Sequence, residues 1–160
     1  MFLLSRHNSI TVLMTMGRSE VALNLYERLQ PFYITAADKM LQLRGQWLFA
    51  RVSASFGRAT ADKTAERAFR AAASTAVQLE LPYESAKILM DLGMFFASRG
   101  RWHALELVVI EALNLLDYLG ISRDAAVAQV LLLAARQRRR SLNLLQRAVL
   151  LINRHHFAAA

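Results

Sequence analysis

The dipeptide Gly-Arg occurs three times in this 160-residue chain, and its spacing constrains the fold more than any other feature. The glycines are Gly17, Gly57 and Gly100, so the intervals between them are 40 and 43 residues. Each dipeptide lies between two apolar stretches of helical periodicity. A glycine just past a helix end can adopt the left-handed conformation of a C-cap, in which a side chain would clash. The repeat therefore predicts a series of helical hairpins.

Apolar side chains recur at spacings of three and four residues, whereas the alternation typical of a half-buried strand is nearly absent. The stripes are Val21, Leu25 and Leu29; Ala65, Phe69, Ala72 and Ala76; Leu105, Val109, Ala112, Leu113 and Leu116; and Leu142, Leu145, Val149 and Ile152. Each stripe is a face that a helix must bury. We therefore predict a single all-α domain, with hairpins at 5–30, 33–80 and 83–119 that end near Pro31, Pro82 and Gly120, then helices at 123–136 and 141–154.

Composition narrows the class of protein. Hydrophobic residues make up 55% of the chain, which excludes a disordered chain and permits one domain or several stacked repeats. The absence of cysteine excludes disulfides, a thiol nucleophile and thiolate metal sites. The apolar start is interrupted at Ser5-Arg6, and the apolar stretch 127–135 is shorter than the ~20 residues of a membrane helix. We expect a soluble, cytoplasmic protein.

The third predicted hairpin carries a familiar set of residues when Ala86 is counted as its first position. The set is Leu92, Gly93 and Phe96 in the first helix, Gly100 and Trp102 at the turn, and Ala112 and Leu113 in the second helix. It resembles a tetratricopeptide repeat (TPR), a helix-turn-helix unit of ~34 residues. Two positions depart from the family pattern, since Leu89 stands where Trp is usual and Leu105 where Ala is usual.

The other hairpins match this pattern at fewer positions. With three residues inserted after its turn, the second hairpin matches at Ala50, Ala65, Phe69 and Ala72, and the first matches at Gly17, Ala22 and Tyr26. The resemblance implies a right-handed superhelix of about three hairpins followed by two C-terminal helices. Residues 119–126, Leu-Gly-Ile-Ser-Arg-Asp-Ala-Ala, are also similar to helical C-terminal regions of bacterial regulatory proteins. The apolar residues 2–4 have no evident cap, so we expect a partner contact there or a longer parent chain.

Close helix packing in such a hairpin needs small residues, and Gly93 is the clearest example. Replacing Gly93 with Leu should overpack the hairpin and cost about 1–3 kcal/mol of stability.

In the TPR family, the first helix of each hairpin lines a concave groove that holds a peptide. The corresponding positions here are His7 and Thr11 in the first hairpin, Arg44, Trp47 and Arg51 in the second, and Lys87, Met90 and Met94 in the third. Trp and Arg are frequent binding hot spots, and Met suits an adaptable surface. The resemblance thus implies a non-catalytic module that binds an acidic or partly apolar segment of another protein. The alternative is that Trp47 and Met90 are core residues and the arginines are merely solvated.

Positive charge is concentrated near the C-terminus. The net charge is +8, and residues 123–160 contain seven Arg but only one acidic residue, Asp124. The densest cluster consists of Arg136, Arg138, Arg139 and Arg140. This cluster could contact nucleic acid or an anionic membrane surface, or it could be a solvated connection between helices. If the cluster contacts nucleic acid, the chain would have an alternative function as a nucleic-acid-associated transcriptional regulator that uses its basic C-terminal end.

No constellation of residues predicts catalysis. The histidines, which are His7, His103, His155 and His156, lack an i, i+4 partner and a carboxylate at metal-ligand spacing. The serines lie outside any nucleophile elbow, and the glycines are too scattered for a phosphate-binding loop. We therefore expect no enzymatic activity, no cofactor and no bound metal.

Overall fold

Helices form the whole fold of the described chain. The computed structural model describes residues 2–137, with side chains from Ser5 onward, and within this range it contains seven helices and no strand. The helices are α1 (Phe2–Thr15), α2 (Ser19–Ile34), α3 (Lys39–Ala54), α4 (Ala59–Gln78), α5 (Pro82–Ser98), α6 (Trp102–Tyr118) and α7 (Ser122–Arg136). The all-α class predicted from the apolar periodicity is confirmed. The predicted helix at 141–154 lies outside the described residues.

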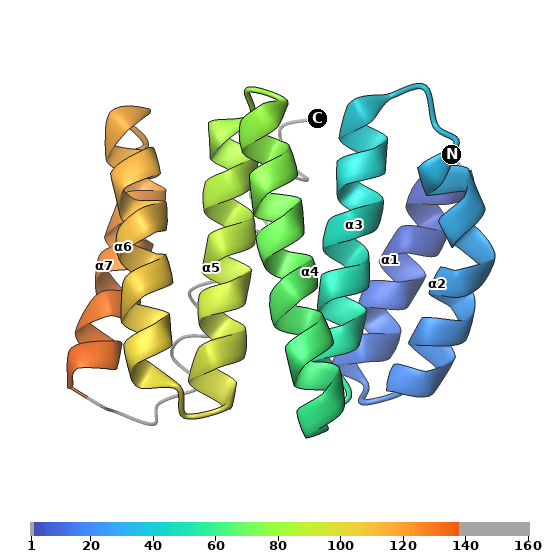
Figure 1. The fold of residues 1–160 in the computed structure, drawn as a ribbon, viewed down its shortest axis with the longest axis horizontal. Coiled ribbons are helices and arrows are strands. Elements are labelled where there is room, and N and C mark those ends of the chain that lie inside the picture. Colours follow the sequence, from blue (N-terminus) through green and yellow to red (C-terminus); the bar gives the residue numbers. More distant parts are fainter. Residues whose placement is uncertain (1, 138–160) are drawn as a thin grey trace. The chain divides into compact units, whose positions relative to one another are not determined.

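The helices belong to two compact units, which are divided in the sequence between Glu80 and Leu81. In the first unit, α3 packs against α2 and α4, and α1 packs mainly against α2. In the second unit, α6 packs against both α5 and α7. Within each unit, Figure 1 shows successive helices running in opposite directions.

The three Gly-Arg dipeptides lie at left-handed turns, as their spacing predicts. The φ angles of Gly17, Gly57 and Gly100 are 72°, 67° and 67°. At the first turn, the amide of Arg18 donates to the carbonyl oxygen five residues earlier at 2.9 Å, which closes the end of α1. Glu80, with φ of 58°, is the one non-glycine residue of the described chain in this conformation, and it follows α4.

The end of α2 differs from the prediction, because the helix continues through Pro31 to Ile34. A proline inside a helix removes one backbone hydrogen bond, so the sequence favours an end near Pro31. The helix ends instead at Thr35, whose amide and hydroxyl donate to the carbonyl oxygen of Pro31 at 3.0 and 2.8 Å. The added turn places Tyr33 on the helix with only 2% of its surface exposed.

The core of the first unit unites α1, α2 and α3. Its buried residues are Ile10, Ala22, Tyr26, Leu29, Tyr33, Leu48 and Val52. Gly45 allows α3 to approach α2 closely, because a Cβ there would lie 2.5 Å from both Cβ and Cγ of Tyr33. This core therefore depends on a close contact that the sequence interpretation did not single out.

The second unit also contains a close helix contact. A Cβ on Gly93 would lie 3.0 Å from Cδ1 of Leu105 and 3.2 Å from Cγ2 of Val109. Both neighbours are buried side chains of α6. The position of Gly93 at a tight α5–α6 contact agrees with the expectation that a large residue would overpack the hairpin.

Candidate binding surface

Five of the predicted groove residues lie on two helices of the first unit, and we call them the α1–α3 surface. They are His7 and Thr11 on α1 and Arg44, Trp47 and Arg51 on α3. The three α3 residues are separated by three and four positions, so they share one face of the helix. Arg44 is exposed, and Trp47 and Arg51 are half-buried. Trp47 is thus neither a core residue nor fully solvated.

His7 is the centre of this surface. Its Nδ1 lies 3.1 Å from the hydroxyl oxygen of Tyr33 on α2, and the two rings meet edge to face with centroids 6.3 Å apart. Burial, followed by the positive charges of Arg51 and Arg44, lowers the pKa of His7 from 6.5 to about 4. Both arginines are therefore close enough to repel a proton from the ring. At neutral pH the imidazole is uncharged and lies beside two cations.

Thr11, the other α1 residue of the surface, already forms a hydrogen bond within its own helix. The hydroxyl of Thr11 donates to the carbonyl oxygen of His7 at 3.3 Å, within its own helix. Thr11 therefore contributes mainly shape to the surface.

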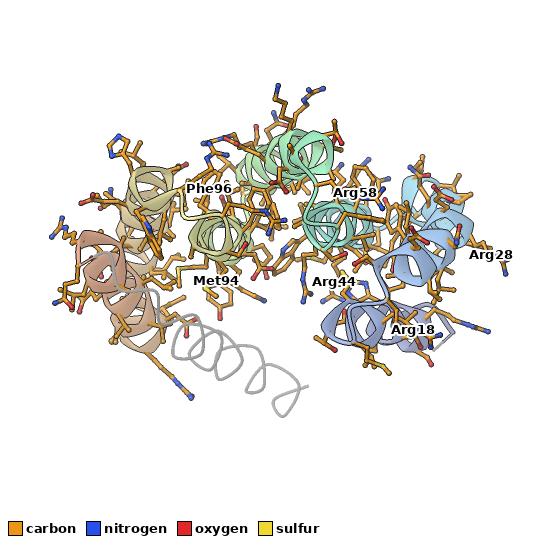
Figure 2. All side chains as sticks on the ribbon, turned by 90° about the horizontal axis from the view of Figure 1, so that it is seen from below. Arg18, Arg28, Arg44, Arg58, Met94 and Phe96 are labelled. Atoms are coloured by element: carbon orange, nitrogen blue, oxygen red, sulfur yellow. The ribbon has the colours of Figure 1, made fainter. Side chains whose placement is uncertain are left out.

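The three predicted groove residues of α5 belong to the second unit and differ in their exposure. Lys87 and Met94 are half-buried, whereas Met90 is 4% exposed. Met90 faces the packed interior, so we correct its assignment and remove it from the candidate surface. Figure 2 shows Met94 and the buried Phe96 on opposite sides of α5.

Lys87 lies beside a partly buried polar contact between α5 and α7. Its Nζ is 5.3 Å from the centroid of the Tyr83 ring, and the Tyr83 hydroxyl donates to Oδ2 of Asp124 at 2.7 Å. Burial and this hydrogen bond raise the pKa of Tyr83 above its ordinary value. Asp124 is 7% exposed, so the tyrosine satisfies a carboxylate that would otherwise be buried at a high energetic cost. We interpret this contact as a structural tie.

Only one residue of the predicted basic cluster lies within the described chain. Arg136, at the end of α7, forms an ion pair with Glu106 of α6, with 2.9 Å between Nε and Oε1. Its charge is thus partly offset by a residue 30 positions earlier. Arg138, Arg139 and Arg140 lie outside the described residues.

The first unit also has a hollow that the sequence interpretation missed, and we call it the α2–α4 groove. Its volume is about 630 Å³, and its lining comes from α2, α3 and α4. Six of its residues are Tyr26, Gln30, Gln46, Phe49, Arg67 and Ala71. The groove could not be predicted from the sequence, because it depends on which helices pack against each other and which do not.

Two kinds of feature are absent from residues 2–137. No group of three His, Asp or Glu side chains in this range is placed to hold a metal ion. No helix in the same range is long and apolar enough to cross a membrane.

Comparisons with protein-family models, with curated proteins and with solved structures found no match to this chain.

Proposed function

We propose that the chain is a non-catalytic, TPR-like module that binds an acidic, partly apolar segment of a partner protein on the α1–α3 surface. It would act as a regulatory or scaffold domain, or as an accessory subunit of a larger assembly. The observation that carries this proposal is that the positive charges of Arg51 and Arg44 both act on His7, whose pKa is lowered by burial and by these charges. A carboxylate of a partner placed there would be attracted by both guanidinium groups.

Trp47 supplies the apolar part of the proposed surface. It lies between Arg44 and Arg51 on the same face of α3, and it is half-buried. A half-buried tryptophan loses little rotamer freedom when a partner binds, and it still offers ring surface for contact. Both properties are common among binding hot spots. A segment that alternates acidic and apolar side chains would match the charges and the ring together.

The TPR-like part of the proposal, including a superhelical arrangement, is supported by local features of two hairpins. The α3–α4 and α5–α6 hairpins turn at Gly57 and Gly100, both with left-handed backbone. Ala72 and Ala112, at the small-residue positions of the repeat, are fully buried. These features suit stacked helical hairpins that each leave one face available.

Charge reversal on the surface provides the main test. We expect the double variant Arg44→Glu/Arg51→Glu to capture its partner from nuclease-treated extract of the source cells at least tenfold less well than the unaltered chain. The matched control is Arg18→Glu/Arg28→Glu, which makes the same charge change at two exposed positions of the same unit (Figure 2). The control should capture the partner normally.

Three outcomes would contradict this proposal. Equal capture by both double variants would exclude the α1–α3 surface, and unchanged capture by Trp47→Ala would exclude the apolar contact. Capture that is lost with nuclease, and also lost when Arg138, Arg139 and Arg140 are changed together to Ala, would support the nucleic-acid-associated regulator instead. A steep loss of affinity with salt would accompany that result.

A further inference from the structure

We propose that the α2–α4 groove of the first unit is a binding site for a small, elongated amphipathic carboxylate of the fatty-acid class. This site contains none of the five residues of the α1–α3 surface, although its lining residue Tyr33 contacts His7, and it does not depend on the partner. Its volume of about 630 Å³ lies within the range of ~300–1,000 Å³ that is typical of small-molecule sites.

The groove exists because of how three helices pack. Among the described helices, α3 packs extensively against both α2 and α4, but α2 and α4 share no comparable interface. The α4 wall carries Ala68 and Ala71, whose methyl groups do not fill the space toward α2. Gly45 of α3 also lines the groove, but the space beside it is filled by Tyr33, whose Cβ and Cγ would lie 2.5 Å from a Cβ at this position. The hollow is therefore built from both helix arrangement and side-chain size.

The shape of the groove favours an extended ligand. Its lining on α4 runs from Thr64 to Thr75, which corresponds to ~16 Å along the helix at ~1.5 Å per residue. A hollow of this length bounded by two helices suits a hydrocarbon chain lying between them better than a compact ring system.

The lining is mainly apolar and aromatic. The Tyr26 ring stacks on the Tyr33 ring with centroids 6.4 Å apart, and it also contacts the Phe49 ring, whose centroid is 5.5 Å away. At the end of α2, the lining residue Ile34 is 65% exposed. A bound hydrocarbon chain would cover this isoleucine and bury its apolar surface, which is favourable at roughly 25 cal/mol per Å².

The charges of the lining favour an anionic head group. Arg67 is the one charged residue among the described lining residues, and it forms no ion pair with a described residue. Its neighbour on α4, Arg70, pairs with Glu66, with Nε 3.4 Å from Oε1. Three glutamines, Gln30, Gln42 and Gln46, line the same groove, and the side-chain amide of Gln42 already donates to the carbonyl oxygen of Ala36 at 2.7 Å. Gln30 and Gln46 therefore provide the two amides that can donate hydrogen bonds to a ligand. One guanidinium and two amides suit the single negative charge and two oxygens of a carboxylate.

Isothermal titration calorimetry of the full chain with sodium laurate, kept below its micelle concentration, tests this site. We expect saturable binding of one laurate per chain. Dodecyltrimethylammonium, which has the same chain length and the opposite charge, should bind at least tenfold more weakly. Saturable binding that is equally tight for both probes would overturn the carboxylate assignment, and no saturable laurate binding would overturn the site.

Variants then locate the bound laurate. Arg67→Gln should weaken laurate binding at least tenfold, whereas the matched control Arg70→Gln on the same helix should leave it unchanged. Ala71→Trp should abolish binding by filling the groove, and Ala68→Leu serves as a second blocking variant if circular dichroism shows that Ala71→Trp does not fold. Equal effects of the two arginine variants, or full binding by a folded blocking variant, would overturn the proposal. Partner capture is a separate readout, so failure here leaves the α1–α3 surface to be judged independently.

Discussion

In the first unit α3 approaches α2 through Gly45, and in the second unit α5 approaches α6 through Gly93. The neighbours of these two glycines differ in how far they can yield. A Cβ at Gly45 would lie 2.5 Å from Cβ and Cγ of Tyr33, the stem of a buried aromatic side chain. A Cβ at Gly93 would meet methyl groups of Leu105 and Val109 at 3.0 and 3.2 Å. Whether a helix contact tolerates an added methyl group therefore depends on whether the facing atoms belong to the stem or to the end of a side chain.

The two units also differ in what they do with polar groups. The first unit places Arg44 and Arg51 beside His7 on an accessible face, and it contains an open groove. The second unit uses its buried Asp124 to accept a hydrogen bond from Tyr83, which connects α7 to α5. The Tyr83–Asp124 contact thus serves packing in the second unit, whereas the proposed recognition role rests on charged side chains of the first unit.

The largest expected effect concerns Gly45. Gly45→Ala should lower the free energy of unfolding by about 3 kcal/mol, because Tyr33 must move, even though alanine favours a helix by ~1 kcal/mol over glycine. Gly93→Ala should cost about 1 kcal/mol or less, since its neighbours are side-chain ends and the helix gains the same propensity. Urea unfolding followed by circular dichroism measures both. Equal losses of unfolding free energy in the two variants would contradict the expectation that the Gly45 contact yields less than the Gly93 contact.

The next effect is a pH dependence that originates at His7. The pKa of His7 is lowered from 6.5 to about 4 in the folded chain, so between these values the unfolded chain binds more protons. Stability from this group is complete above pH 6.5 and is lost as the pH falls toward 4. We expect a loss of about 2 kcal/mol, which allows for the solvent that still reaches the ring.

The variant His7→Asn isolates this contribution. Carboxylates titrate in both chains, so their effects cancel in the difference between the two free energies of unfolding. The advantage of the unaltered chain over His7→Asn at pH 7 should shrink as the pH falls to 4.5. Parallel stability curves for the two chains would mean that burial and the charges of Arg51 and Arg44 do not lower the pKa of His7 in the folded chain.

These contacts show which parts of the molecule could be predicted from sequence. The helices and their left-handed turns were predictable because apolar spacing and glycine act locally. Tyr33 could not be predicted as a core residue, because Pro31 favours a helix end before it, whereas tertiary packing of the next turn outweighs the lost hydrogen bond. Gly45 was missed for the same reason, since its importance depends on Tyr33.

The candidate site was partly predictable. The spacing of Arg44, Trp47 and Arg51 places them on one helix face in any α-helix. In contrast, the burial of Met90 and the pairing of Arg136 with Glu106 depend on neighbouring helices, which spacing along one helix does not reveal.

A smaller effect is expected in the second unit. Tyr83→Phe removes the hydroxyl that donates to Asp124 at 2.7 Å and leaves a buried carboxylate without this donor. The free energy of unfolding should fall by about 1.5 kcal/mol. Asp124→Asn retains an oxygen that accepts from Tyr83, so its loss should be smaller. Urea unfolding distinguishes the two variants, and a greater loss for Asp124→Asn would show that the carboxylate charge matters more than the hydrogen bond.

The smallest expected effect has the opposite sign and concerns the end of α4. Glu80 adopts the left-handed conformation that glycine adopts at the turns after α1, α3, α5 and α6. This conformation costs a residue with a side chain about 1 kcal/mol relative to glycine, so Glu80→Gly should stabilise the first unit by about that amount. Gly100→Ala, the reverse exchange in the second unit, should destabilise by a similar amount, because a Cβ there meets no neighbour within 4 Å and only the backbone is strained. Thermal unfolding of both variants measures the pair, and a loss of stability in Glu80→Gly would mean that contacts of the glutamate side chain outweigh the strain of its backbone.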